Sequence, residues 1–362
     1  MNDYLNALAQ QSRNVSLIEI DLADGAEGIE SILSSGTVRP RFVTVRHEKQ
    51  EDWTTIIHLS SKNDLAFDLL VRLSEEGFLV YRASKTGTQL VHRDSVAEVW
   101  PALMNGEYER DSNGIVYRYT GPRAKGKAKS LAVVFSSVHS NMYTQKLERH
   151  FAPVFPMLES SVGSQTAVLR IADLDGVVGG FYLPTKRDPE STSKIVDLIR
   201  RMASSLDIPM DRVVTLGPSK GGTGALYCAL ELDVSCVSID PIITNNRLDT
   251  REEDRYFATT SIFESSRDEM FDEAFVRYLD RGLIENKSQF SVITSQKSVE
   301  YDDICKLKAR SGVNNLHLIE TTNEQIQAHH EVAPKTVAFA LGLLNVYLSG
   351  LSVSLSDHNI ID

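Results

Sequence analysis

The segment Gly217-Pro218-Ser219-Lys220-Gly221 has the pattern G-x-S-x-G, which is typical of a reactive serine on a sharp turn between a strand and a helix. The apolar run "RVVTLG" precedes it and the helix-like run "TGALYCALEL" follows. Glycines two residues either side of the serine leave room for a strained backbone. The turn would also place the Lys220 backbone N–H at a helix start, where it can donate to a developing oxyanion. The pattern therefore predicts Ser219 as a nucleophile.

Two other readings of this segment remain. A glycine-rich turn that only serves packing is one. A phosphate-binding loop is the other, but that loop needs its lysine after the last glycine, and Lys220 precedes Gly221.

A nucleophilic serine needs a base, and chain order in this architecture runs serine, acid, histidine. Among nine histidines, this order favours the pair in "IQAHHEVAPKT", expected in a loop before the last helix. We predict His330 as the base and keep His329 as the neighbouring alternative, because the sequence does not tell which ring points inward. His317 alternates within a strand and is expected to be structural.

The acid is expected after the apolar run "FSVITS", where it would orient the imidazole. The segment "SVEYDD" offers three carboxylates there. We rank Glu300 first and Asp302 second, with Asp303 also open. Asp240 ends the preceding apolar run and is the outside choice, since some hydrolases carry the acid one strand earlier.

The second oxyanion donor is expected in the loop after "LAVVF", where residues 136–138 offer backbone N–H groups, and we carry Ser137 forward. His139 follows and would either contact substrate or sit at a helix entry.

Three charged residues are candidates for substrate binding. The Lys220 side chain would bind an anionic substrate beside the nucleophile or carry its charge into water. Arg170 and Asp173, near the end of "VLRIAD", form a plausible substrate edge.

Apolar runs alternate with amphipathic helices from residue 131 onward, which predicts a mostly parallel sheet covered on both faces. Right-handed crossovers would place all carboxyl ends of the strands on one edge, where a ligand crevice forms. The runs expected as strands are 131–137, 166–173, 212–217, 235–241, 289–295 and 315–321, and helices are expected in 191–208, after Thr223, near 301–309 and after Pro334.

Residues 1–120 are expected to form a smaller α+β segment of unknown role, with strands at 41–47, 54–60 and 77–84 and a helix at 63–77. Residues 121–362 would form the catalytic domain, with 121–130 as a linker or hairpin turn. The charged stretch 242–288 is expected to form a cap over the site or simply a longer crossover.

The composition is that of a globular protein, with 42% hydrophobic and 24% charged residues. A net charge of −11 argues against nucleic acid as a partner. Three cysteines without framework spacing, and an N-terminus without signal character, predict a cytoplasmic protein. No transmembrane segment is expected, because the most apolar stretch, 336–351, is short and interrupted. No metal site or bound cofactor is expected.

The run "LAVVFSS … VLRIADLDGVVGGFYLP … VVTLGPSKGGTGALYCAL … SIDPI" resembles the XcbB/CpsF family of capsular polysaccharide biosynthesis proteins over residues 115 to 350. It is more distantly similar to the α/β-hydrolase-like acyltransferase component of the accessory Sec system. The resemblance implies an α/β-hydrolase-like fold, a cytoplasmic bacterial protein and a role in building a surface glycan. It places the elbow serine at Ser219, the acid at Glu300 or Asp302, and the histidine at His330.

Our first hypothesis is a serine-dependent acyl (acetyl) transferase or esterase that acts on a capsule or surface-polysaccharide precursor. An acyl donor such as acetyl-CoA would serve it, although no sequence feature marks a CoA site. The second hypothesis is a non-catalytic scaffold that partners capsule glycosyltransferases. A third is a lyase or glycosyl-transfer role with Asp240 and Asp302 as acid and base.

Overall fold

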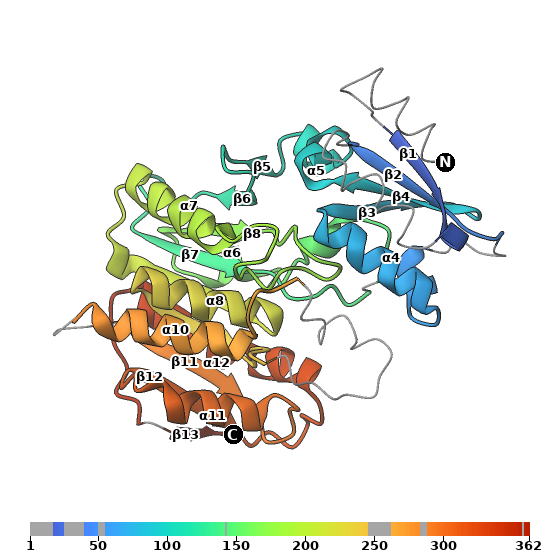
Figure 1. The fold of residues 1–362 in the computed structure, drawn as a ribbon. Helices are drawn as coiled ribbons and strands as arrows, with labels where there is room; N and C mark the ends of the chain where they lie inside the picture. The colour runs from blue at the N-terminus through green and yellow to red at the C-terminus, as the bar shows by residue number, and fades with distance from the viewer. Residues whose placement is uncertain are drawn as a thin grey trace.

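The computed structural model describes residues 17–24, 40–49, 55–141, 143–244, 262–282, 288–356 and 358–362. Two sheets organise these residues, one of nine strands and one of four. They lie beside each other, with the smaller sheet on the N-terminal side (Figure 1).

The nine-stranded sheet has the order β13-β12-β11-β10-β9-β7-β8-β6-β5. Its strands are β5 (Glu109–Arg110), β6 (Val116–Thr120), β7 (Ser130–Phe135), β8 (Thr166–Ile171), β9 (Val213–Pro218), β10 (Ser235–Ile239), β11 (Phe290–Thr294), β12 (Leu316–Thr321) and β13 (His358–Ile361). Strands β7 to β13 pair in parallel, whereas β6 runs antiparallel to β8 and β5 antiparallel to β6. The central strands are buried along their whole length, which explains their continuous apolar runs.

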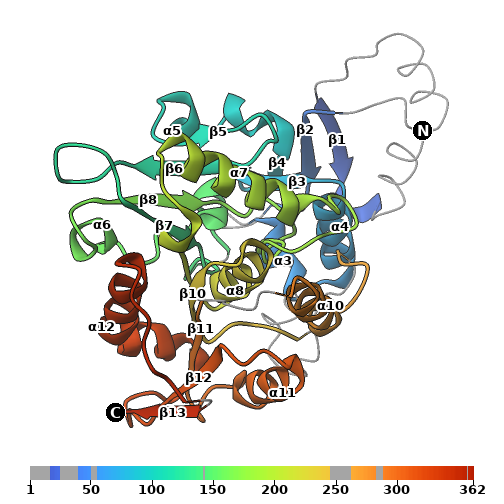
Figure 2. The same cartoon turned by 90° about the vertical axis from the view of Figure 1, so that its left-hand side faces the viewer.

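Helices cover both faces of this sheet. One face carries α7 (Ser191–Ser205), α8 (Lys220–Leu232), α10 (Arg267–Asp280) and α11 (Tyr301–Ser311), and the other carries α6 (Leu158–Ser161) and α12 (His329–Leu348). Figure 2 shows these two layers with the strands between them. Short 3₁₀ turns, η3 (Leu147–His150) and η4 (Met210–Arg212), complete this part. The predicted fold class, a mostly parallel sheet covered on both faces, is confirmed.

The last helix, α12, begins earlier than expected. It starts at His329, five residues before Pro334, which lies inside the helix. The two adjacent histidines therefore belong to the first turn of a helix and not to a loop, and the helix fixes which ring points toward the sheet.

The smaller sheet has the order β1-β2-β4-β3 and carries two helices. Its elements are β1 (Leu17–Asp21), η1 (Leu22–Asp24), β2 (Phe42–Arg46), α3 (Ile56–Ser60), α4 (Asp64–Glu75), β3 (Phe78–Ala83), β4 (Gly87–His92), η2 (Arg93–Glu98) and α5 (Pro101–Met104). We call the described residues from Leu17 to Met104 the N-terminal unit. The predicted strands at 41–47 and 77–84 and the helix at 63–77 are confirmed.

The strand expected at 54–60 is wrong, because residues Ile56–Ser60 form α3. A capping box at its start is the cause: the Thr55 hydroxyl accepts a hydrogen bond from the His58 N–H at 3.3 Å, and the His58 ring reaches back to the Thr55 N–H. The domain boundary expected at residue 121 falls inside the large sheet, since β5 and β6 already pair with it.

The N-terminal unit packs on loops at the carboxyl ends of β7 and β8. Its apolar core, built by α3, α4 and the small sheet, includes Val178 and contacts Val138, Tyr143 and Val177 from these loops. The unit therefore lies over the edge of the large sheet where the sequence places the chemistry.

The described parts of the expected cap, residues 242–244, 262–282 and 288, include α10, which packs on α8 as the crossover helix between β10 and β11. Residues 245–261 and 283–287 lie outside the described residues. Within the described ranges, no helix is both long and apolar enough to cross a membrane.

Candidate active site

Ser219 stands on the turn between β9 and α8. Its backbone has φ 55° and ψ −125°, a conformation that is rare for a residue with a side chain. The surrounding structure holds it, because its N–H donates to the Ile239 carbonyl at 2.8 Å and its carbonyl accepts from the Thr223 N–H at 3.1 Å. Ser219 is partly exposed although its neighbours on both sides are buried. The elbow predicted from G-x-S-x-G is confirmed as a geometry.

Two glycines of the motif are required by close backbone approach. A Cβ atom on Gly217 would overlap the Gly221 carbonyl, and one on Gly221 would overlap the Phe135 carbonyl at the end of β7. The second contact brings the loop after β7 against the first turn of α8. The glycines therefore assemble two chain segments around Ser219.

The ring that reaches Ser219 belongs to His329. The Ser219 Oγ and the His329 Nε2 are 2.8 Å apart, and the His329 Nδ1 is 2.7 Å from the Asp240 Oδ2. A carboxylate accepts only, so we assign the proton to Nδ1, and Nε2 is left to accept the serine proton. The arrangement is that of nucleophile, base and orienting acid.

Asp240 follows β10 directly and is 1% exposed. Besides the imidazole it accepts hydrogen bonds from the Thr294 hydroxyl at 2.6 Å and the Ser298 hydroxyl at 2.5 Å. A buried carboxylate needs such partners to remain charged. Its backbone has φ 47°, another left-handed conformation at this edge of the sheet.

The residues predicted as the base and as the acid are both wrong. His330, the predicted base, is the exposed neighbour of His329 on α12. Glu300, the predicted acid, is buried at the start of α11, and Asp302 is exposed in the first turn of the same helix. Asp240, ranked as the outside choice, occupies the acid position, and the signal for it was its place directly after the strand that follows the elbow.

Asp303, the third carboxylate considered, accepts a hydrogen bond from the Thr244 hydroxyl at 2.8 Å. It joins Thr244 to α11 and does not serve the imidazole, whose Nδ1 partner is Asp240.

Backbone N–H groups from two segments are the predicted oxyanion donors. Lys220 is the first residue of α8, where an N–H has no carbonyl partner within the helix. In the loop after β7 the Ser136 N–H donates to the Tyr182 hydroxyl at 2.7 Å, so the next N–H along is that of Ser137. The oxyanion roles of Lys220 and Ser137 stay predictions that fit this layout.

The Lys220 side chain does not reach substrate, contrary to our prediction. It is 0% exposed, and its Nζ donates to the Asp173 Oδ2 at 2.9 Å. Burial lowers the pKa of Lys220, and the adjacent Asp173 carboxylate opposes that shift. Asp173 also accepts from the N–H groups of Gly180 and Phe181, so its predicted substrate contact is wrong as well.

Arg170 is likewise structural. Its guanidinium pairs with Glu159 at 2.9 Å and donates to the carbonyls of Val154 and Phe155 at 2.7 and 3.0 Å. It therefore holds α6 and the segment before it. His139 lies in the loop after β7, where its Nδ1 accepts from the Asn141 N–H at 3.0 Å, and its contact with substrate stays a prediction.

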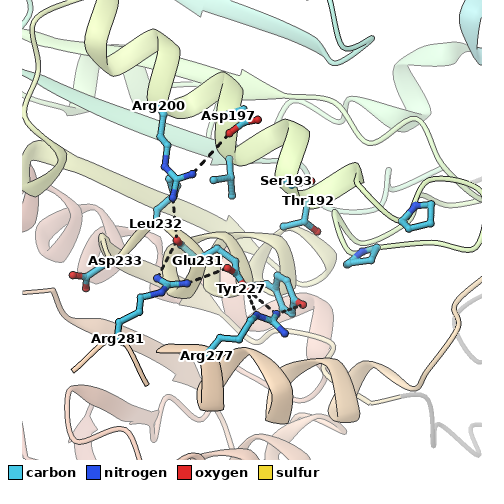
Figure 3. Close-up of a pocket in the computed structure, with 13 residues that line it drawn as sticks. Thr192, Ser193, Asp197, Arg200, Tyr227, Glu231, Leu232, Asp233, Arg277 and Arg281 are labelled. Atoms are coloured by element: carbon cyan, nitrogen blue, oxygen red, sulfur yellow. Dashed lines mark hydrogen bonds and ion pairs between the residues drawn. The ribbon is translucent and has the colours of Figure 1, made fainter. Parts of the chain in front are cut away.

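A cavity of 540 Å³ lies between α7, α8 and α10 (Figure 3). Its lining residues from α8 are Tyr227, Glu231 and Leu232, which belong to the end of the helix away from Ser219. Arg277 donates to Glu231 at 2.8 Å and to the Tyr227 hydroxyl at 3.0 Å, and Arg281 pairs with Glu231 at 3.1 Å. These bonds fasten α10 to α8, so the charged lining of the cavity is engaged in holding helices together. Ser219 does not line it.

Among the described residues, no group of three or more histidine, cysteine, aspartate and glutamate side chains is placed to hold an ion.

No protein-family model matches the chain, and no curated protein matches it. Solved structures do. An esterase structure from a study of two fungal esterases of Rhizomucor miehei is similar with a TM-score of 0.48 and 14% identity, covering 72% of this chain and 92% of that one. An S-formylglutathione hydrolase from Agrobacterium tumefaciens has a TM-score of 0.46 and 15% identity, covering 68% and 94%.

A glycosylation-associated protein (Gap123) complex from Streptococcus agalactiae has a TM-score of 0.45 and 19% identity. The likeness covers 72% of this chain and 50% of that one. The strand order and the serine elbow themselves define an α/β-hydrolase-like fold with a smaller N-terminal unit. What the chain does with this fold must be argued from the site.

Proposed function

We propose that the protein is a serine-dependent acyl transferase or esterase. The observation that supports this proposal is the continuous hydrogen-bonded chain from Ser219 through His329 to Asp240, with Ser219 on a strained and accessible turn. A serine that only serves packing would need neither the imidazole nor the buried carboxylate behind it.

In the first half of the reaction, the Ser219 oxygen attacks an acyl carbonyl while its proton passes to the His329 Nε2. The carbonyl electrons move to oxygen, and the N–H groups of Lys220 and Ser137 stabilise that charge. The imidazolium, held by Asp240, returns its proton to the leaving alcohol or thiol as the bond to the acyl carbon breaks. An acyl-serine results.

In the second half, His329 takes a proton from water or from an acceptor hydroxyl, which attacks the acyl-serine. Collapse of the tetrahedral intermediate returns the proton to Ser219 and releases an acid or an acylated acceptor. Transfer and hydrolysis share these steps, and exclusion of water decides between them.

As the specific role we propose acyl transfer, with acetyl as the group, to a capsular or surface polysaccharide precursor. The resemblance of residues 115 to 350 to the XcbB/CpsF family motivates this choice, and an acyl thioester such as acetyl-CoA would be a suitable donor. A non-catalytic scaffold for capsule glycosyltransferases is the second candidate. The glycosyl-transfer role loses support, because the Asp240 carboxylate is occupied by His329, Thr294 and Ser298.

The test is turnover of p-nitrophenyl acetate by the full chain and by its Ser219→Ala form, with and without a de-O-acetylated bacterial capsular polysaccharide. An acyl transferase or esterase releases p-nitrophenol with a multiple-turnover rate that the alanine form lacks. Acetylated polysaccharide among the products identifies transfer. A wild-type rate equal to that of Ser219→Ala would contradict the enzyme proposal and favour the scaffold.

A further inference from the structure

The N-terminal unit contacts both loops that flank the serine elbow. Val138 belongs to the loop after β7, which is expected to supply an oxyanion donor, and Val177 and Val178 belong to the loop after β8. All three pack against the apolar core of the N-terminal unit. The unit therefore restricts these loops from the side opposite to the large sheet.

Arg93, directly after β4, adds a polar clamp to this contact. Its guanidinium donates to Asp175 at 3.2 Å and to Asp188 at 3.1 Å, and the three side chains are 14%, 10% and 9% exposed. The Thr185 hydroxyl donates to Asp175 at 3.1 Å and accepts from the Asp188 N–H at 3.1 Å. Arg93 thus bridges both ends of one loop, residues 173–190.

Inside this loop the backbone is strained. Phe181 and Tyr182 both have positive φ, 58° and 62°, which side chains disfavour. Such conformations persist only where the surroundings over-determine them, and they cluster at functional sites. Here Asp173 accepts from the N–H groups of Gly180 at 2.8 Å and Phe181 at 2.9 Å, and Lys220 neutralises Asp173.

The strained turn delivers the Tyr182 hydroxyl to the start of the loop after β7. It accepts from the Ser136 N–H at 2.7 Å and lies 3.1 Å from the carbonyls of both Ser136 and Ile171, to which it can donate. The ring lies against Gly224 of α8, where an added Cβ would come within 2.5 Å of the ring. One side chain therefore sets the spacing between α8 and the loop that begins at Ser136.

We propose that Tyr182 and Arg93 are positioning residues of the acyl-transfer site, and that the N-terminal unit acts through them to hold the oxyanion donors in place. This inference rests on the proposed function. Arg93 fixes the loop 173–190, the loop presents Tyr182, and Tyr182 fixes Ser136 so that the Ser137 N–H stands beside the Lys220 N–H. A displacement of about 1 Å at such a donor can cost about 100-fold in rate.

The experiment measures kcat and KM for p-nitrophenyl acetate per reactive Ser219, with reactive sites counted by complete labelling with a fluorophosphonate. Tyr182→Phe should lower kcat about 10- to 100-fold and leave KM within about threefold, since an oxyanion donor acts in the transition state. Its melting temperature is recorded alongside. A residue that only supports folding would lower the number of reactive sites and leave kcat per site unchanged.

Arg93→Met removes both ion pairs, and Arg93→Lys keeps one cation at the loop. We expect kcat per site to fall most in Arg93→Met and by an intermediate amount in Arg93→Lys. Arg41→Met is the matched control, because among the described residues the Arg41 side chain forms its ion pair with exposed Glu98 in the same unit, and it should match wild type. If Arg93→Met does not fold, the kcat values per site of Arg93→Lys and Tyr182→Phe test the inference.

Wild-type kcat per site in both Tyr182→Phe and Arg93→Lys would overturn this inference and leave the proposed function standing. Absence of Ser219-dependent turnover in the wild type would overturn the proposed function itself, so the two failures are distinguishable.

Discussion

Asp240 is the residue on which the chemistry of the site depends most. Its carboxylate binds the His329 Nδ1 and is satisfied otherwise by two hydroxyls, those of Thr294 and Ser298. Two strands and the following turn therefore fix one carboxylate, which in turn fixes the tautomer of the ring. Orientation of the imidazole is decided by this buried group and not by the exposed face of α12.

Replacement of Asp240 by asparagine should lower kcat for p-nitrophenyl acetate about 10³- to 10⁴-fold. The amide oxygen can still accept from Thr294, while the amide NH2 takes the place of the oxygen that faces His329 and Ser298. This NH2 donates, so it no longer stabilises the imidazolium and favours the wrong tautomer. Circular dichroism should show the fold retained. Asp302→Asn serves as the control, because Asp302 is an exposed carboxylate that the sequence also suggested as the acid. A rate within threefold of wild type for Asp240→Asn would contradict the assignment of Asp240 as the orienting acid.

At the residue scale the sequence predicts the elbow serine, whereas His329 is the neighbour of the predicted base and Asp240 lies one strand before the predicted acid. Ser219 is predictable because strand, glycines and helix follow one another within a few residues. The choice of His329 over His330 depends on where α12 begins, which Pro334 obscures. The choice of Asp240 over Glu300 depends on which strand end lies nearest the ring, and local pattern does not carry that information.

The first turns of α8 show how element packing builds the site. Gly221 meets the Phe135 carbonyl, and Gly224 meets the Tyr182 ring. Because these two residues of α8 are glycines, the loop after β7 and the loop after β8 can approach the nucleophile.

Gly221→Ala should destabilise the protein by about 1–3 kcal/mol, as overpacking of a close contact does, and should lower kcat because the loop after β7 must move. Gly342→Ala is the matched control. Gly342 lies within α12, and outside its own helix backbone no atom of the described residues comes within 4 Å of its Cβ position, so alanine there should stabilise the protein by up to about 1 kcal/mol. Urea unfolding of both variants checks this, and equal stabilities would argue against the close approach at Gly221.

The parallel strands β7 to β12 of the large sheet are predictable because they are almost wholly buried and therefore mostly apolar, whereas the partly exposed strands β5, β6 and β13 were not predicted. The structure of the segment 54–60 is not predictable in this way, because its β-branched residues indicate a strand while Thr55 and His58 form the capping box of a helix. Local hydrogen bonding overrode propensity there. The predicted substrate contact of the Lys220 side chain is wrong for a similar reason, because its carboxylate partner Asp173 comes from the folded loop 173–190.

At the scale of the whole molecule, a buried polar network beneath the site connects the N-terminal unit to the large sheet. Arg149, fully buried, donates to the Val80 carbonyl at 3.1 Å and to the His150 Nε2 at 3.0 Å, and the His150 Nδ1 donates to the Asp173 carbonyl at 2.9 Å. The network thus runs from β3 of the N-terminal unit to the ion pair behind the elbow. A long-range connection of this kind has no signature in local sequence, and the role of the N-terminal unit could not be predicted for that reason.

Burial lowers the pKa of His150 well below 6.5, and the charges of Arg149 and Lys220 lower it further. The folded protein keeps this ring neutral, whereas the unfolded chain binds a proton below about pH 6.5. The contribution of His150 to the free energy of unfolding should therefore be fully present above pH 6.5. It should be lost as the pH falls below 6.5, by up to about 1.4 kcal/mol per pH unit. Urea unfolding between pH 8 and pH 5 measures it.

His150→Gln is the comparison for that experiment, because the amide can accept from Arg149 and donate to the Asp173 carbonyl. Its free energy of unfolding should depend less on pH than that of wild type. An identical pH dependence in the two proteins would show that His150 does not titrate on unfolding as described.

The most direct test of the account is the site and rate of fluorophosphonate labelling, followed by mass spectrometry, in wild type, His329→Ala and His330→Ala. Wild type and His330→Ala should label on Ser219 at similar rates, while His329→Ala should label at least about 100-fold more slowly because the serine has lost its base. Rapid labelling of His329→Ala, or modification of wild type at a residue other than Ser219, would contradict the assignment of Ser219 as nucleophile and His329 as its base.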